Sequence, residues 1–275
     1  MSKLTTIAVD AMGGDDSPHK IINGINHHFK TNNNIFYKIF GNSEEIKKVL
    51  PNSLPSTAFE IIHTKEKVKG NDSALSAARG KDSSMWLAVE SVKNKESDII
   101  ISAGNTGALF VIAKLNLKMI ENIDKPALSA LWPNKKGMSV VLDLGANIEC
   151  SSKNLVDFSI MGASLYKSLY QNETPNVALL NIGSEEFKGN EIIKETFQIL
   201  NEKKLKSFNF SGYIEGNELM NGNVNVIISD SSANIDLIDK VVHWKDKGYL
   251  MGLSGKTFRL CLYLRQAKPC FFWTE

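Results

Sequence analysis

The sequence predicts an α/β protein with a mostly parallel sheet covered by helices on both faces, a three-layer α/β/α arrangement. Strand-like apolar runs alternate along the chain with helix-like amphipathic stretches, and most of the strands end in a glycine-containing turn that leads into a helix. Repeated strand–turn–helix units are typical of parallel sheets, because the crossover between two parallel strands usually contains a helix.

The composition is that of an ordinary globular protein. The 275 residues are 43% hydrophobic and 23% charged, and the net charge is +2, so nothing global indicates nucleic acid binding. The length allows one large domain or two smaller lobes. No apolar run approaches the roughly 20 residues of a membrane span. The three cysteines have no metal-ligand spacing, and the first residues run straight into a strand, so we expect a cytoplasmic protein without a signal peptide.

Four strands and four helices are expected in the first part of the chain. Ser17 and Pro18 predict a helix start, with Ser17 as the N-cap and Pro18 at the first position. Residues 65–82 are expected to form a polar loop. Residues 98–102 show no polar alternation, which is typical of a strand buried on both faces. The strands are expected at 4–10, 35–40, 59–63 and 98–102, and the helices at 18–30, 43–50, 83–92 and 106–119.

The second part repeats the pattern with longer connections. Residues 140–144 are apolar except for Asp143 and are expected to form a buried strand that ends at Gly145, and residues 183–190 form a polar loop before another helix. Further strands are expected at 140–144, 176–182, 208–214 and 224–229, and helices at 155–170 and from the end of the 183–190 loop to residue 203.

Polar loops at the strand ends are the best candidates for a functional site. The carboxyl ends of parallel strands lie along one edge of a sheet, so these loops should converge there. The loops concerned are 10–15, 102–108, 143–147, 183–190 and 229–230.

The loop at 102–108 has the character of an anion site. Its two glycines allow backbone N–H groups to approach a ligand closely, and the helix that begins near Thr106 presents the positive end of its dipole. Phosphate suits such a position. A plain strand-to-helix turn capped by Asn105 or Thr106 explains the same residues equally well.

Acidic and basic residues occur in several of these loops. Asp10 and Asp143 each close a predicted strand and could orient loops by accepting N–H bonds, whereas metal binding is disfavoured because no histidine cluster accompanies them. Lys188 could neutralise phosphate or polarise a carbonyl, although most lysines are simply solvated. Arg79 and Lys81 precede a predicted helix start, which makes a second plausible anion pocket. No Ser-His-Asp or Cys-His apparatus is evident.

Seven motifs occur in an order that resembles one known family. The chain is similar, from residue 4 to about residue 230, to the bacterial phosphate acyltransferases of phospholipid synthesis (PlsX). The motifs Asp-Ala-Met-Gly-Gly-Asp and Ser-Ala-Gly-Asn-Thr-Gly-Ala-Leu are the most specific. The resemblance is carried by residues 7–15, 83–85, 101–109, 124–128, 142–147, 181–185 and 188–191.

The resemblance implies a fold, an activity and partners. The fold would be similar to isocitrate and isopropylmalate dehydrogenases and to phosphotransacetylases. The activity would be transfer of a long-chain acyl group from acyl carrier protein to inorganic phosphate, giving acyl phosphate for phospholipid synthesis. The family implies a cytoplasmic homodimer with some peripheral contact to the membrane, without a cofactor, a metal or nucleic acid.

Individual roles follow from the same resemblance. Because phosphate is itself the nucleophile, no serine or cysteine nucleophile is needed. Catalytic roles are implied for Lys188 and Asn234. Phosphate or substrate binding is implied for Gly13, Gly14, Ser83, Ser84, Asn105, Thr106, Gly107 and Asn190. Loop orientation is implied for Asp10, Asp143 and Asn147.

The chain departs from the family pattern after Asp230. The family continues there with a glycine-containing Asp-Gly-Phe-Thr/Ser-Gly-Asn loop, whereas this chain has no glycine and only Asn234 in a comparable position. We therefore expect an acyltransferase-like domain at 1–230 and a divergent, incomplete remainder of it at 231–275. A truncated, inactive homologue that retains ligand or carrier-protein binding is the alternative. A phosphotransacetylase or a dehydrogenase is a third possibility. The dehydrogenase is disfavoured because this chain lacks the Gly-x-Gly-x-x-Gly turn expected of one.

Overall fold

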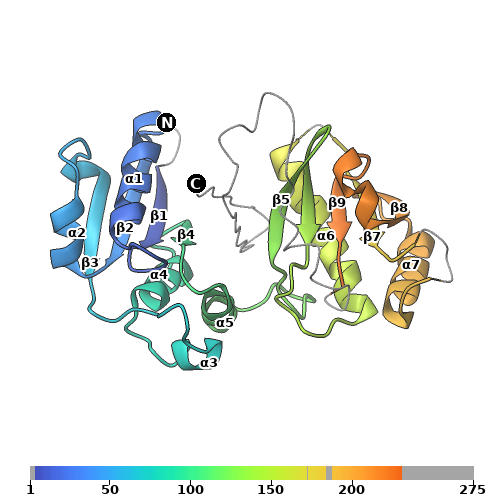
Figure 1. Ribbon diagram of the computed structural model, residues 1–275, viewed down its shortest axis with the longest axis horizontal. Helices are drawn as coiled ribbons and strands as arrows, with labels where there is room; N and C mark the ends of the chain where they lie inside the picture. The colour runs from blue at the N-terminus through green and yellow to red at the C-terminus, as the bar shows by residue number, and fades with distance from the viewer. Residues whose placement is uncertain (1–3, 172, 184–187, 231–275) are drawn as a thin grey trace. The chain divides into compact units, whose positions relative to one another are not determined.

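The computed structural model describes residues 4–171, 173–183 and 188–230 (Figure 1). The chain divides into two compact units, with the boundary between Met119 and Ile120. Each unit has its own sheet, and most neighbouring strands in both sheets are parallel. The described part is therefore an α/β protein built on two mostly parallel sheets.

Unit 1 contains a four-stranded sheet in the order β3-β2-β1-β4, in which all pairs are parallel. Its strands are β1 (Thr5–Asp10), β2 (Ile35–Gly41), β3 (Phe59–His63) and β4 (Ile99–Ser102), which confirms the four predicted strands. Its helices are α1 (His19–Thr31), α2 (Ser43–Val49), η1 (Ser56–Ala58), α3 (Ala74–Ala77), α4 (Ser84–Lys93) and α5 (Thr106–Leu117). The short α3 lies inside the segment that was predicted to be loop throughout.

The burial of the strands in unit 1 follows their position in the sheet. The central strand β1 has Ile7 and Ala8 fully buried, and α4 packs on β1, β2 and β4. β4 was predicted to be buried on both faces, and this is wrong. Only Ile100 of β4 is buried, because β4 lies at an edge of the described sheet and pairs with β1 alone.

Side-chain caps begin several helices of unit 1, but the predicted cap of α1 is wrong. The residue preceding α1 is Pro18, which provides no side-chain cap. The Ser17 hydroxyl instead donates to the carbonyl oxygen of Gly13, and so closes the loop that follows β1. Asn42 caps α2 and Ser83 caps α4, each by accepting backbone N–H bonds.

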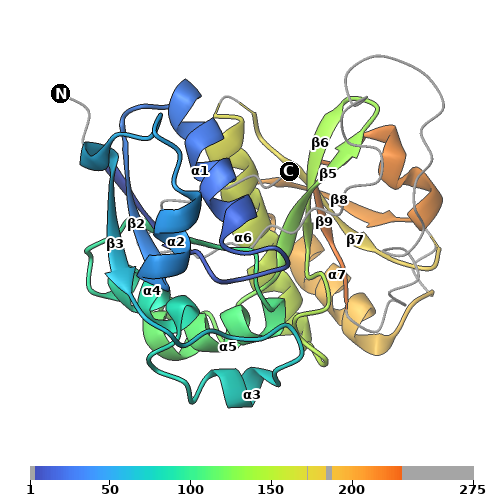
Figure 2. The ribbon, with the colours of Figure 1, turned by 60° about the vertical axis from the view of Figure 1, so that its left-hand side comes forward.

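Unit 2 contains a five-stranded sheet in the order β5-β6-β9-β7-β8 (Figure 2). Its strands are β5 (Ser129–Asn134), β6 (Gly137–Leu142), β7 (Asn176–Leu180), β8 (Asn209–Ile214) and β9 (Val226–Ile228). Its helices are α6 (Ser152–Leu169), α7 (Glu191–Lys203) and η2 (Gly216–Asn221). β5 pairs antiparallel with β6 and was not predicted, because Pro133 interrupts its strand pattern. Proline is tolerated there since β5 is an edge strand.

The central strands of unit 2 are buried on both faces, as the sequence predicted for β6. Alternate residues belong to two hydrophobic clusters. On one face Val140, Val177 and Val226 pack in the cluster that contains α6 and α7 residues. On the other face their neighbours Val141, Ala178 and Ile227 pack with Trp132, Leu144 and Leu219. The two clusters fix the register of the sheet, since a one-residue slip would exchange the faces.

Candidate functional site

The carboxylate of Asp10 joins three chain segments at the carboxyl edge of the unit 1 sheet. Asp10 is 1% exposed and closes β1. The Ser84 hydroxyl donates to Oδ1 of Asp10 at 2.6 Å, and the Ser102 hydroxyl donates to Oδ2 at 2.6 Å. The backbone N–H of Met12 also donates to Oδ1, at 3.3 Å. The loops after β1 and β4 and the start of α4 therefore converge, as expected for ends of parallel strands.

The loops after β1 and β4 touch through their glycines. A Cβ on Gly13 would lie 2.6 Å from Oδ2 of Asp10 and 2.8 Å from the backbone nitrogen of Gly104. The N–H of Gly104 donates to the Ser102 hydroxyl at 3.1 Å, which extends the network from Asp10 into the second loop. Gly14 has φ +84° and faces the carbonyl oxygen of Ala103, so its conformation and its contact both favour glycine.

Burial raises the pKa of Asp10 above its ordinary value. Removal of the carboxyl from water is the largest influence, and it outweighs the bonds from Ser102, Ser84, Met12 and Gly13, which lower the pKa. The ionised form of Asp10 is therefore less favoured in the folded protein than in water.

The start of α5 is capped by Asn105 rather than by Thr106. Oδ1 of Asn105 accepts the N–H of Ala108 at 2.9 Å. Nδ2 donates to the carbonyl oxygens of Gly70 and Asp72, at 2.9 and 3.0 Å, so the whole side-chain amide is engaged. Thr106 and Gly107 form the first turn, where Gly107 is exposed. An anion at this helix start would be met by backbone N–H groups and the helix dipole rather than by the Asn105 side chain.

Ser83 and Ser84 were predicted to provide hydroxyl donors for phosphate. Their side chains are 3% and 1% exposed. The Ser83 hydroxyl accepts the N–H of Trp86 at 3.3 Å, and the hydroxyl proton of Ser84 is directed to Asp10. These contacts give both serines a structural task at the start of α4.

Asp143 occupies the equivalent strand-end position in unit 2. It is 2% exposed and follows β6. Its Oδ1 accepts the N–H of Leu128 at 2.7 Å, and its Oδ2 accepts both the N–H and the side-chain amide of Asn147 at 2.9 Å. The same Asn147 amide donates to the carbonyl oxygen of Pro126 at 2.8 Å. Asp143 and Asn147 thereby hold the segment before β5 against the loop after β6.

A second loop of unit 2 is organised by Asn181 and Asn190. Asn181 follows β7, and its amide donates to the backbone carbonyl of Lys188 at 3.1 Å. Gly189 has φ +93°, and a Cβ there would lie 2.5 Å from Oδ1 of Asn181. Asn190 caps α7 through the N–H of Ile193 and donates to the carboxylate of Asp230 at 2.8 Å. A polar contact thus joins the start of α7 to the segment that follows β9. The predicted catalytic residue Asn234 lies outside the described residues.

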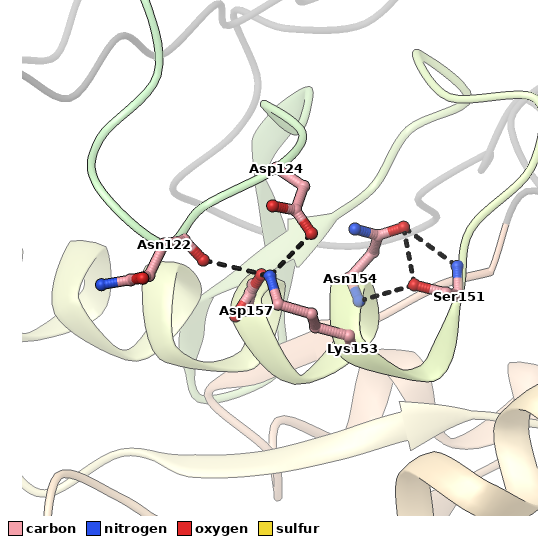
Figure 3. A network of polar contacts seen from close by, with 6 residues as sticks. All are labelled: Asn122, Asp124, Ser151, Lys153, Asn154 and Asp157. Atoms are coloured by element: carbon pink, nitrogen blue, oxygen red, sulfur yellow. Dashed lines mark hydrogen bonds and ion pairs between the residues drawn. The ribbon is translucent and has the colours of Figure 1, made fainter.

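An ion network fixes the start of unit 2 to α6 (Figure 3). Lys153 donates to the carbonyl oxygen of Asn122 at 3.1 Å and to the carboxylates of Asp124 and Asp157 at 2.7 and 3.1 Å. The side chain of Lys153 is 54% exposed, so solvent screens these pairs. The bonds from Asp124 and Asp157 raise the pKa of Lys153. Beside this network, Ser151 and Asn154 form a capping box at the start of α6.

The sequence interpretation gave no individual role to three residues that organise these loops, although two of them lie in the loops 102–108 and 229–230 that were expected to converge. They are Ser102, Asn181 and Asp230, which contact Asp10, Lys188 and Asn190 respectively. Each is a polar residue at or within two residues of the end of an apolar strand, which is the signal that could have identified them. In the part of the chain that the structure describes, no group of three or more His, Cys, Asp or Glu side chains could hold a metal ion. No helix within the described residues has the length and apolar character to cross a membrane.

Comparisons with known proteins place these loops in a family context. The profile of the family described as "Fatty acid synthesis protein" matches residues 5–242. Phosphate acyltransferase from Pelagibacter ubique is 71% identical over 239 residues, which are 86% of this chain and 72% of that protein. Phosphate acyltransferase from Neorickettsia sennetsu is 42% identical over 234 residues, covering 84% of this chain and 68% of that protein.

Solved structures share the fold at low sequence identity. A phosphotransacetylase from Streptococcus pyogenes is similar with a TM-score of 0.60 at 14% identity, covering 86% of this chain and 80% of that one. This likeness supports the α/β fold with mostly parallel sheets. The predicted similarity to isocitrate and isopropylmalate dehydrogenases stays a prediction.

Proposed function

This chain belongs to the phosphate acyltransferase family, and on that premise we propose that it transfers a long-chain acyl group from an acyl carrier protein thioester to inorganic phosphate. The acyl phosphate product would serve phospholipid synthesis. The observation that carries the proposal is the 71% identity to a phosphate acyltransferase over 239 residues, 86% of this chain. The family profile matches residues 5–242, which include every strand-end loop described above.

The reaction needs positioning and electrostatic stabilisation rather than a protein nucleophile. A phosphate oxygen attacks the thioester carbonyl carbon and forms a C–O bond, while the carbonyl oxygen becomes an oxyanion. The C–S bond then breaks, the carbonyl re-forms, and the sulfur leaves as a thiolate that takes up a proton. Groups that hold phosphate beside the carbonyl and stabilise the oxyanion supply most of the rate in such a reaction.

We assign the phosphate to the first turn of α5. The backbone there presents the N–H group of Gly107 together with the positive end of a twelve-residue helix. The loop after β1 packs closely against the loop that leads into α5, because Gly13 lies against the backbone of Gly104. Asn105 and Asp10 act in this proposal as positioning residues, because their side chains hold the loops rather than point to a ligand.

For Lys188, in unit 2, we propose an electrostatic role in the reaction, as a positive charge that stabilises an anion or an oxyanion. Its backbone is held by Asn181, and the following Gly189 and Asn190 lead directly into α7. A fixed backbone limits the positions that the Lys188 ammonium group can reach, which favours electrostatic preorganisation.

Substitution of Lys188 tests this role. Purified Lys188→Ala protein should form acyl phosphate from acyl carrier protein thioester and phosphate with kcat reduced about 10²- to 10³-fold, as for loss of one oxyanion donor. Lys188→Arg, which keeps the charge, should retain more activity, and Lys203→Ala on the exposed end of α7 should behave as wild type. Wild-type rates in Lys188→Ala would remove the role of Lys188. If the wild-type chain binds carrier protein but forms no acyl phosphate, the alternative of an inactive homologue would be supported instead.

The family also leads us to propose a cytoplasmic homodimer with peripheral membrane contact. Light scattering of the purified chain would test the dimer, and sedimentation with phospholipid vesicles would test the membrane contact. A monomeric mass at micromolar concentration would contradict the first part of this proposal.

A further inference from the structure

The segment that joins β3 to α4 is rich in exposed positive charge. It carries five basic side chains against three acidic ones, and all five basic residues are exposed. Among the described residues none of the five forms an ion pair, so their charge is directed to solvent. The basic residues are Lys65, Lys67, Lys69, Arg79 and Lys81, and the acidic residues are Glu66, Asp72 and Asp82.

This basic segment, residues 65–82, begins at the same sheet edge as the candidate phosphate loop. β3 runs parallel to β2, and β2 and β4 both run parallel to β1, so the chain leaves β3 on the side where the loops after β1 and β4 lie. Figure 2 shows α3, which lies within the segment, beside α5, with which it is in contact. The segment that carries this charge therefore lies next to α5.

Hydrogen bonds fix the backbone of the basic segment. Its two ends are joined by the Thr64 hydroxyl, which donates to the carbonyl oxygen of Asp82 at 2.6 Å. The N–H of Ser84 donates to the carbonyl oxygen of Glu66 at 3.0 Å. The amide of Asn105 holds Gly70 and Asp72. Because Asn105 also caps α5, a partner bound to this segment would lie next to the first turn of α5.

The segment also exposes an apolar side chain. Leu75 on α3 is 72% exposed, whereas its neighbour Ala77 is buried. The basic segment thus combines an exposed apolar side chain with exposed cations, and protein-binding surfaces combine an apolar centre with a charged rim. A single exposed leucine would carry no argument alone.

We propose that the basic segment 65–82 docks the acidic surface of the carrier protein that delivers the acyl thioester. The inference rests on the proposed function and adds the partner's binding surface to it. A protein partner fits better than an anionic membrane, because Glu66 and Asp82 are exposed among the cations and would be repelled by a uniformly negative surface. A folded partner can place its carboxylates opposite the cations alone.

Charge reversal tests the docking surface. The variant Lys65→Glu/Lys67→Glu/Lys69→Glu should raise KM for the acyl carrier protein thioester about tenfold or more, with kcat and KM for phosphate unchanged. The KM of the wild type for this donor should rise with salt, and the dependence should be weaker in the variant. Lys47→Glu/Lys48→Glu on α2, an exposed basic pair of the same unit, is the matched control and should leave KM at the wild-type value.

A direct binding measurement separates this proposal from the proposed function. Fluorescence anisotropy with labelled carrier protein should show a weaker Kd for the variant whether or not the chain turns over. Absence of acyl phosphate formation by the wild type would overturn the proposed function. A variant that binds the carrier protein with the wild-type Kd would overturn the docking surface. An equal rise of KM for a coenzyme A thioester, or a defect confined to binding of phosphatidylglycerol vesicles, would also overturn it. Lys67→Glu alone provides a milder variant should the triple variant fail to fold.

Discussion

Two aspartates occupy matching places in the two units but hold their loops by different means. Asp10 follows β1 and Asp143 follows β6, and both are almost completely buried. Asp10 accepts hydrogen bonds from the hydroxyl groups of Ser84 and Ser102, residues that are 74 and 92 positions away. Asp143 accepts hydrogen bonds from the backbone N–H of Leu128 and from the backbone and side-chain amides of Asn147, which lie 15 and 4 positions away.

The difference separates a tertiary junction from a local clamp. The bonds to Asp10 come from other elements of unit 1, so this carboxylate joins the loops of two strands and a helix. The bonds to Asp143 come from the adjoining hairpin and its own loop. The donors around Asp10 include the buried Ser84 and Met12, whereas Leu128 and Asn147 are only partly buried. If the carboxylate is removed, water can therefore reach and satisfy the donors around Asp143 more readily than those around Asp10.

Removal of the two carboxylates should give the largest effects and should rank them. Asp10→Ala leaves buried donors without an acceptor, so we expect the free energy of unfolding to fall by about 2–4 kcal/mol. Asp143→Ala should cost less, about 1–3 kcal/mol, because its donors reach solvent. Urea unfolding followed by circular dichroism measures both values. Equal losses, or a larger loss for Asp143→Ala, would contradict the distinction between junction and clamp.

The glycine contact beside Asp10 should give the next largest effect. In Gly13→Ala the new methyl group would meet Asp10 and Gly104 at distances below 3 Å, so the loops must separate. We expect a loss of about 1–3 kcal/mol of unfolding free energy and a higher KM for phosphate. Gly24→Ala is the matched control, since a Cβ at this α1 position has no neighbour within 4 Å. That control should gain roughly 0.5–1 kcal/mol from helix propensity.

The ionisation of Asp10 should make the junction sensitive to pH. Its folded-state pKa lies above the ordinary value of 3.8, so the folded protein binds this proton more tightly than the unfolded chain does. The corresponding contribution to stability is present below pH 3.8 and is lost as pH rises towards the folded-state pKa. Wild type should therefore lose stability relative to Asp10→Asn as pH rises through that interval. A difference that stays constant as pH rises from below 3.8 would show that Asp10 does not titrate as inferred.

The sequence predicted the local parts of this comparison better than the long-range parts. Strand ends at Asp10 and Asp143 follow from apolar runs, and the confirmed strands of unit 1 have clear turn signals. The contact of Ser84 with Asp10 could not be predicted, since no periodicity relates residues 74 positions apart. β5 was missed because Pro133 is unusual in a strand, and β4 was assigned too much burial because an edge position is a property of the sheet.

Helix starts show the same limit on a smaller scale. Both Asn105 and Thr106 have side chains that can cap a helix, and the choice of Asn105 depends on its additional bonds to Gly70 and Asp72. Ser17 precedes a proline at a helix start, yet its hydroxyl bonds to Gly13 because the loop brings that carbonyl within reach. Tertiary contacts thus selected between local patterns of equal quality.

Substitution of Lys153 should have the smallest effect on the free energy of unfolding. Lys153 provides an exposed contact to compare with the buried contacts of Asp10 and Asp143. Its three bonds join Asn122, Asp124 and Asp157, but the ammonium group is exposed and competes with water and salt. We expect Lys153→Ala to unfold at the same urea concentration as wild type within error. Amide hydrogen exchange should nevertheless become faster at residues 122–125, because this segment loses its attachment to α6. Lys167→Ala, near the other end of α6, should leave that exchange unchanged. A clear drop in the urea midpoint for Lys153→Ala would mean that this surface network stabilises unit 2 as a whole, in the way we attribute to Asp10 for unit 1.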